Sequence, residues 1–358
     1  MQRTQKFAIA TAVVCLACTA SLWRMTKARA QSGGSPDNIV VQQVVCTSST
    51  SLDCVWTHHN DNTRGGVNPN ESILTPSTVG NLTVLKSVTT DGLIYAQPLY
   101  VSQISTTAQG TNCGGGTQTR NMVYVATEND SVYAFDDVAA DTNPCWQTSV
   151  MPTGETPVPY TSLPEVPDSK NSNIEVPCTD LVPQVGITST PVIDINVNPP
   201  LMYVLAKTVD SGGTFHFRLH VIKLRDGTDL TSFDVGSNVS AFNPAVLNQR
   251  SGLALYHSGN SSFIYMSFGS LCDSNVINGA ISTTPYTGWL AAFDVDYSGG
   301  GSVPSVLSTN YFQVESSPTS STKGGIWMGG GAPAIDNTHG TVFLAPRERP
   351  FRWLEQVG

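Results

Sequence analysis

Two neighbouring histidines near the start of the mature chain are the first residues whose chemistry could matter. His58 and His59, with Asp61, carry side chains that often bind metal ions. Adjacent residues of an extended segment point to opposite faces, so these imidazoles would converge on one ion only through a special turn. We expect Asn60, Asp61 and Asn62 to cap turns instead.

A second histidine pair lies further along the chain. His216 and His220 have a helix-like spacing, but the segment from Phe215 to His220 alternates between apolar and polar residues as a strand does. We therefore expect two exposed side chains on one strand face and no metal site.

The glycine-rich segment Gly324–Gly331 is the most unusual local string. It is not a phosphate loop, because no Lys-Ser/Thr pair follows the glycines. Trp327 is the candidate cofactor-binding residue, since its ring could stack on a planar quinone or sugar. The other interpretation is that the glycines let a strand pass a crowded axis while Trp327 fills the core. No residue pattern assigns a catalytic group, so the catalytic residues are unknown.

The first 30 residues predict a signal peptide. Arg3 and Lys6 precede the apolar run from Phe7 to Trp23, and Ala28-Arg-Ala30 has the small residues of a cleavage site. We expect cleavage after Ala30 and a periplasmic or secreted protein. The alternatives are an uncleaved membrane anchor, because the apolar run barely approaches a spanning length, and a lipoprotein modified at Cys18.

Six cysteines remain after cleavage, and an even number in an exported chain favours disulfides. Cys46 and Cys54 are close in sequence and are the first pair that we predict. Buried free thiols are the alternative. A metal site is not expected, because no C-x-x-C spacing occurs. The disulfide candidates are Cys46, Cys54, Cys113, Cys145, Cys178 and Cys272.

The composition favours an acidic chain of short strands. Removing the signal peptide from the 358 residues leaves 13 basic and 27 acidic residues, a formal net charge of −14. Such a surface repels phosphate, so we expect neither nucleic acid nor an anionic membrane as a partner. The 31 glycines and 22 prolines suit many strands joined by turns.

Internal repetition is the main signal between the two ends of the chain. Each unit has a strand, a turn and a second strand that ends in an Ala-Phe-Asp or similar string. The predicted strands are 121–127, 131–136 and the short outer strand 145–148, then 201–206 and 219–224, then 263–268 and 288–294, and finally 341–343. Met151–Asp180, rich in Pro, Ser and Asp, is the clearest insertion between units.

Each unit follows a segment of small residues, often with proline, which we call an opener. The four openers are Ala96-Gln-Pro98, Ser189-Thr-Pro191, Ser251-Gly252 and Gly331-Ala-Pro333. Recurrence of one unit predicts an all-β fold, a β-propeller of four-stranded antiparallel blades. Residues 92–345 would hold about four blades, a partial ring, after an entry segment and leading strand at 31–91. A β-sandwich is the competing architecture.

Four segments are similar to pyrroloquinoline-quinone (PQQ)-type β-propeller proteins, the quinoprotein alcohol dehydrogenase-like class: Trp56–Arg64, Leu74–Leu82, Asp130–Asp136 and Trp289–Asp294. The resemblance implies PQQ and Ca²⁺ as cofactors of an alcohol or sugar dehydrogenase. It also implies an adjacent cysteine pair under the quinone, and this chain has no neighbouring cysteines in its mature part. The calcium ligands and the catalytic Asp of that family cannot be mapped onto this sequence.

The last residues, 346–358, differ in composition from the preceding strand. Three arginines lie among the twelve residues from Arg347 to Gly358. One permissible codon choice, read one nucleotide later, encodes Gly-Asn-Gly-Pro-Phe-Asp-Gly-Leu-Asn-Arg-Ser, which has the turn chemistry of the rest of the chain. We therefore predict a frameshift near Pro346 and a truncated family member.

These observations favour an exported scaffold or binding module without catalytic activity. The alternative is a fragment of a PQQ- and calcium-dependent alcohol or sugar dehydrogenase, and a third class is a structural protein of the cell surface. An adjacent cysteine pair and a full set of blades in a longer gene product would favour the enzyme.

Overall fold

The computed structural model describes residues 54–68, 71, 73–138, 141–167, 175–271, 276–277, 280–281, 286–297, 303–315 and 324–347. The description below concerns the unit that spans 44–358. The predicted signal peptide, Cys46, Cys272 and the tail beyond Arg347 lie outside the described residues. None of the described residues form a helix long and apolar enough to cross a membrane.

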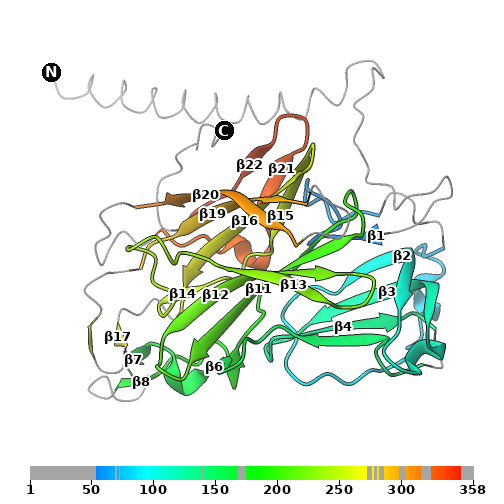
Figure 1. Ribbon diagram of the computed structural model, residues 1–358, viewed down its shortest axis with the longest axis horizontal. Coiled ribbons are helices and arrows are strands. Elements are labelled where there is room, and N and C mark those ends of the chain that lie inside the picture. The colour runs from blue at the N-terminus through cyan, green and yellow to red at the C-terminus, as the bar shows by residue number, and fades with distance from the viewer. Residues whose placement is uncertain are drawn as a thin grey trace, which may run out of the picture. The chain divides into compact units, whose positions relative to one another are not determined.

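The all-β prediction is confirmed: antiparallel sheets make up the described fold (Figure 1). Short 3-10 turns interrupt them at η2 (Val79–Asn81), η3 (Asn112–Gly114), η4 (Tyr160–Ser162) and η5 (Met328–Gly330). The first sheet has the order β1-β2-β3-β4-β5, with β1 (Cys54–Val55), β2 (Leu99–Thr107), β3 (Thr117–Ala126), β4 (Ser131–Asp136) and β5 (Trp146–Ser149). β1 is the one strand of the entry segment among the described residues.

The second and third sheets repeat this arrangement, since each contains four strands that pair antiparallel in chain order. The second contains β10 (Val192–Asp194), β11 (Leu201–Asp210), β12 (Phe215–Lys223) and β13 (Asp229–Asp234). The third contains β15 (Ala254–Ser258), β16 (Ser261–Ser270), β19 (Trp289–Asp296) and β20 (Ser305–Gln313), and β14 (Leu247–Asn248) also pairs with β16. A hairpin of β21 (Ala334–Asp336) and β22 (Thr341–Phe343) follows.

The predicted repeats therefore correspond to real strands. The run 131–136 is β4, 263–268 lies within β16 and 341–343 is β22. The boundary predicted at residue 219 was wrong, because β12 already begins at Phe215. There its backbone pairs with Val209 of the long neighbouring strand β11, which extends the ladder beyond the apolar run.

Aromatic side chains fill the space between the second and third sheets. The ring of Phe217 lies 5.0 Å from that of Phe268, and Phe242 packs edge-on against both Phe268 and Trp289. These side chains are almost fully buried. Because large buried rings contribute most of the apolar area of a core, this cluster holds the two sheets together.

The insertion Met151–Asp180 contains short strands. β6 (Glu155–Pro159) pairs with β11 and with β9 (Gln184–Val185), so it extends the second sheet. β7 (Glu165–Pro167) and β8 (Glu175–Pro177) form a hairpin. β7 also pairs with β17 (Val276–Ile277), which pairs in turn with β18 (Ala280–Ile281). The insertion therefore contacts a second excursion that lies between β16 and β19.

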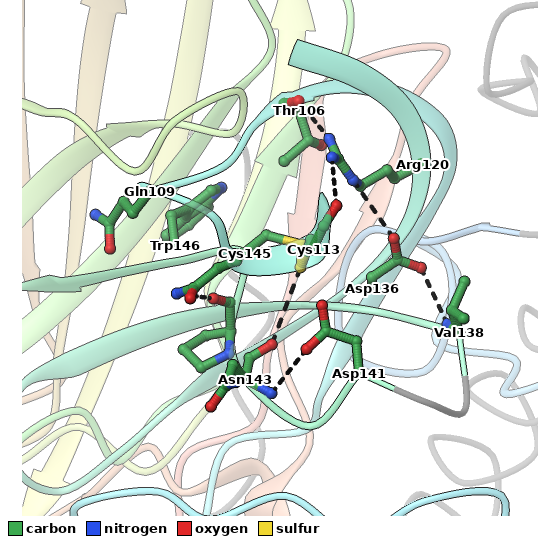
Figure 2. The surroundings of a disulfide bond; sticks show 12 residues. Thr106, Gln109, Cys113, Arg120, Asp136, Val138, Asp141, Asn143, Cys145 and Trp146 are labelled. Carbon is green, nitrogen blue, oxygen red and sulfur yellow. Dashed lines mark hydrogen bonds and ion pairs between the residues drawn. A yellow bond between two sulfur atoms is a disulfide. The ribbon is translucent and has the colours of Figure 1, made fainter. Parts of the chain in front are cut away.

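A disulfide joins Cys113 to Cys145, two residues that are 32 apart in sequence. It ties the turn before β3 to the start of β5, beside the buried Trp146 (Figure 2). Cys54 and Cys178 are also disulfide-bonded. The prediction of disulfides is thus confirmed for the four described cysteines, and the Cys46–Cys54 pairing stays a prediction.

Candidate functional site

The four openers are hydrogen-bonded in succession, although long stretches of sequence separate them. The amide of Gln97 donates to Thr190 Oγ1 at 2.9 Å, and the amide of Leu253 donates to the Thr190 carbonyl at 2.9 Å. The amide of Gly252 donates to the Gly331 carbonyl at 2.8 Å. We call this meeting place the opener junction. Each opener leads directly into the first strand of its unit: β2, β10, β15 or β21.

The entry segment crosses the first strands of three successive units. The carbonyl of Trp56 accepts the Ile193 amide at 2.9 Å, and the Asn62 carbonyl accepts the Ile335 amide at 2.9 Å. The side chain of Asn62 donates to the Leu255 carbonyl at 2.8 Å. Residues 56–62 therefore link β10, β15 and β21 beside the opener junction.

Arg64 completes this link with a buried guanidinium. Its Nε donates to the Pro333 carbonyl at 2.8 Å, and its Nη1 donates both to Thr57 Oγ1 at 2.7 Å and to the His58 carbonyl at 2.9 Å. Burial lowers the pKa of Arg64 to about 10, so the side chain stays charged at neutral pH. Hydrogen bonds to main-chain carbonyls satisfy its donors, which is the behaviour of a structural arginine.

The two histidines of the entry segment lie in a turn. His59 and Asn60 have left-handed φ angles of 55° and 73°, and the rings of His58 and His59 stack with their centroids 4.1 Å apart. The assumption of an extended segment was therefore wrong. Asp61 caps the turn as predicted, since its Oδ1 accepts the Thr63 amide at 2.8 Å. Burial, with the neighbouring positive groups, lowers the pKa of His58 to about 4, so this ring is neutral at neutral pH.

Arg250 directly precedes the third opener, and its guanidinium is partly buried. Its Cζ lies over the ring of Tyr95, 5.9 Å from the ring centroid. A Cβ added to Gly330 would lie 3.4 Å from its terminal nitrogen, so the chain after Trp327 runs close beside it. Within the described part of the chain, Arg250 has no hydrogen-bond acceptor and no ion-pair partner.

Two buried acids lie in the turn between β3 and β4. Glu128 Oε2 accepts the Gly186 amide at 2.6 Å and the Thr188 hydroxyl at 3.1 Å, whereas Oε1 has no partner among the described residues. Asp130 is fully buried, and neither of its carboxylate oxygens has a hydrogen-bond partner among the described residues. Burial raises the pKa of Glu128 to about 7 and that of Asp130 well above its ordinary value.

Lys207 of β11 is a third buried ionisable residue, and it is 1% exposed. Its Nζ donates to the Leu247 carbonyl at 2.7 Å and lies 5.2 Å from the centroid of the Phe217 ring. Burial lowers the pKa of Lys207 to about 7, and the charge of Glu128 acts in the opposite direction. Glu128 and Lys207 can therefore both change protonation state near neutral pH.

Sequence reasoning missed four residues near the openers: Glu128, Asp130, Lys207 and Arg250. Weak signals existed for each of them. Lys207 is charged at the end of the apolar run 201–206, and Arg250 adjoins an opener. The turn 128–130 was predicted, but burial of its two acids follows from contact with Gly186, which lies far away in the sequence.

Trp327 lies at the start of η5 and packs on the third sheet. A Cβ added to Gly269 of β16 would lie 2.5 Å from Trp327 Cε2, so the ring requires glycine at that position. A Cβ at Gly325 would lie 2.8 Å from the indole nitrogen. The glycines thus permit close packing of this ring, and ligand stacking on Trp327 stays a prediction.

The expectation for His216 and His220 was wrong in part. Both belong to the central strand β12, but His220 is buried and its Nδ1 lies 2.7 Å from Asp229 Oδ2. His216 Nδ1 lies 3.0 Å from Asp234 Oδ2. Carboxylates from the region of β13 therefore pair with both imidazoles, which the alternation within one strand could not reveal.

Asp136 lies close to the sulfurs of Cys113 and Cys145, so these three residues form a cluster with metal-ligand atoms. The two sulfurs are bonded to each other and supply no thiolate. Asp136 pairs instead with Arg120, whose Nε lies 3.4 Å from Oδ2, as Figure 2 shows. This cluster is structural.

The chain matches no known family model, and no curated protein matches it at a significant level.

Proposed function

We propose that this protein is an exported, non-catalytic binding module of the β-propeller type, whose ligand-binding surface lies at the opener junction. The observation that carries the proposal is the hydrogen bonding of the four openers in succession. In a propeller, the first strand of each blade lies nearest the axis, so the segments that lead into these strands meet there.

The repeated sheets support the propeller in a second way. Three units contain four antiparallel strands each, in chain order, and a fourth unit begins with β21 and β22. Neighbouring sheets pack through large rings: the indole nitrogen of Trp146 in the first sheet donates to the Leu224 carbonyl beside the second at 3.1 Å. About four blades in 92–345, of the PQQ-type repeat class, remain our proposal for this architecture.

A binding role is supported by the polar groups that gather near the openers. Buried polar groups in proteins are nearly always paired with protein groups or ordered water. Within the described residues, Ser189 and Ser251 of two openers have buried hydroxyls without a partner. One carboxylate oxygen of Glu128 and both carboxylate oxygens of Asp130 also lack a partner among these residues. A bound polar molecule with its water would supply those partners.

The alternative is a fragment of a PQQ- and calcium-dependent dehydrogenase. The position of Trp327 beside glycines favours it, because an indole at a close backbone approach could cover a planar ring. The cysteines do not fit such a site. Cys113 and Cys145 are bonded to each other across 32 residues at the edge of the first sheet, so they do not form an adjacent pair. We therefore derive no reaction step through a quinone.

A dye-linked dehydrogenase assay separates the two proposals. Purified protein is incubated with PQQ and CaCl₂, and reduction of an artificial electron acceptor is followed with primary alcohols and with aldoses. We expect no turnover above that of heat-denatured protein. Turnover that disappears in Trp327→Ala would overturn the non-catalytic proposal and establish the dehydrogenase alternative.

Export is tested separately by sequencing the amino terminus of protein recovered from the periplasm or the culture medium. We expect it to begin at Gln31. Protein that keeps Met1 and stays in the cell would contradict the proposed export.

A further inference from the structure

Arg250 differs from every other arginine that the structure describes. Arg64, Arg120 and Arg218 donate to carbonyl or carboxylate oxygens, Arg225 donates to a threonine hydroxyl, and Arg347 also has interactions. Among these arginines, Arg250 alone has no acceptor within the described part of the chain, although its side chain is partly buried. None of its nitrogens is among the buried unpaired atoms of the described residues, so its donors reach solvent and are available to a ligand.

The surroundings of Arg250 leave its donor edge available. Arg250 Cζ lies over the ring of Tyr95, 5.9 Å from its centroid. A guanidinium that faces an aromatic ring keeps its N–H groups in its own plane, where they form a fork for two oxygen atoms. Gly330, with φ of +80°, lies close beside the guanidinium, and a Cβ there would lie 3.4 Å from Arg250 Nη2, so a side chain at this position would crowd the group.

The charges nearby favour a single negative charge on the ligand. His58 is neutral at neutral pH and adds no second cation. The charge of Arg250 acts to lower the pKa of Glu128, but the two side chains form no ion pair among the described residues. Without the predicted signal peptide, the chain carries a formal charge of −14. The single positive charge of a guanidinium balances the single negative charge of a carboxylate. A phosphate dianion would leave one negative charge uncompensated in an acidic protein.

We propose that Arg250 binds the carboxylate of a small organic acid at the opener junction. This inference rests on the proposed binding function and names its ligand class. The carboxylate accepts two parallel N–H donors of the guanidinium, with Tyr95 against the face of that group.

Side-chain NMR tests the proposal even when binding is weak. The arginine Nε–H signals of ¹⁵N-labelled protein are recorded while sodium acetate or sodium glycolate replaces sodium chloride at constant ionic strength. Arg250→Gln identifies the Arg250 signal by its disappearance. We expect this signal to shift in a saturable manner, and the signal of the exposed Arg225 to stay unchanged.

The affinities of variants are then compared by calorimetry or by ligand-dependent shifts of the backbone amide signals of Gly252 and Gly331. We expect Arg250→Gln to weaken acetate and glycolate binding about tenfold or more, because a charged hydrogen-bond donor is lost. Arg250→Lys keeps the charge but loses the fork, so it should bind less tightly than the natural protein and more tightly than Arg250→Gln. Arg225→Gln is the matched control and should bind as the natural protein does.

Three results would overturn the proposal: no saturable shift of the Arg250 signal, equal binding by Arg250→Gln, or tighter binding of sulfate and phosphate than of either carboxylate. Failure of the proposed function is seen separately, as quinone-dependent turnover. A protein that turns over substrate but binds acetate through Arg250 would retain the carboxylate site and lose only the non-catalytic role.

Discussion

Two arginines of this protein show how differently its polar groups are treated in two regions. Arg120, beside the disulfide of the first sheet, donates to the carbonyls of Thr106 and Cys113 and pairs with Asp136 (Figure 2). Arg250, beside the openers, has no such partner in the described part of the chain. In the first region the donors of the arginine are paired within the protein. In the second region the donors of the arginine have no described protein acceptor and can bind a ligand.

Two buried aspartates repeat the contrast. Asp194 of β10 accepts His257 Nδ1 at 2.9 Å and the Ser262 hydroxyl at 2.5 Å, and these contacts lower its pKa although burial opposes them. Asp130 has no partner among the described residues, and burial raises its pKa. Both acids are buried, so their hydrogen-bond partners, rather than burial alone, account for the opposite directions of their pKa shifts.

The largest effect is expected from the disulfide, which belongs to the paired region. Replacing both Cys113 and Cys145 by alanine should lower the free energy of unfolding by about 3 kcal/mol, because the unfolded chain regains the freedom of the closed loop. Urea unfolding measures the loss. Carboxylate binding at Arg250 should be unchanged in buffer, and its disappearance in a folded double variant would show that the two regions are not independent.

A slightly smaller loss is expected at Gly186, where the acids meet the second unit. A Cβ at this position would lie 2.5 Å from the Glu128 carbonyl oxygen and 2.7 Å from Asp130 Oδ1. Gly186→Ala should therefore cost about 2 kcal/mol, since main-chain atoms must move. Gly80→Ala is the matched control, because nothing lies within 4 Å of a Cβ there. Equal stability of the two variants would contradict this packing.

The two aspartates should respond to amidation with opposite signs. Asp194→Asn should destabilise the protein at pH 7 by about 1–3 kcal/mol, because a carboxylate that pairs with His257 is lost. Asp130→Asn should stabilise it at the same pH by about 1 kcal/mol, since the folded protein no longer has to hold a proton that the unfolded chain releases, and asparagine tolerates the φ of 52°. Unfolding in urea measures both variants, and a shared sign would break the contrast.

The pH dependence sharpens this prediction. Asp130 has a raised pKa in the folded state, so above the ordinary aspartate pKa the folded protein holds a proton that the unfolded chain has lost. Its contribution to stability therefore falls as the pH rises toward the folded-state pKa. Asp130→Asn should remove that part of the slope. Asp194, with a lowered pKa, contributes stability above the ordinary value that is lost as the pH falls through the folded-state pKa.

The smallest effect is expected at His257. Its hydrogen bond to Asp194 raises its pKa, so the stability that this pair adds is fully present below pH 6.5, the ordinary value, and is lost as the pH rises through the raised one. His257→Gln should cost about 1 kcal/mol at pH 6 and less at pH 9. Thermal unfolding at the two pH values gives the difference, and a loss independent of pH would contradict a charged pair.

Local sequence patterns were enough to predict the strands but not the site. The apolar runs at 131–136 and 263–268 predicted β4 and β16, because alternation and length are properties of a strand alone. The fate of polar residues depends on distant partners. His220 was expected to be exposed, yet Asp229 pairs with it from the neighbouring strand.

The openers also show that local patterns do not predict long-range hydrogen bonds. Their composition was recognisable, and each one does precede the first strand of a unit. Their hydrogen bonds join Thr190 to Gln97 and Leu253, which are far apart along the chain, so no local pattern predicts them. Arg250 acquires its significance only from this meeting, because its lack of an acceptor is visible only when all its neighbours are known.

Amide hydrogen exchange at the opener junction tests the central claim most directly. The amides of Gln97 and Gly252 each donate to another opener, and that of Leu253, the residue after the third opener, donates to the second, so we expect all three to exchange slowly and at a common rate set by opening of the whole junction. Slow exchange of all three, further slowed by saturating acetate, is the predicted result. Exchange at the rates of an unstructured peptide would show that the openers do not meet and would contradict both the architecture and the binding site.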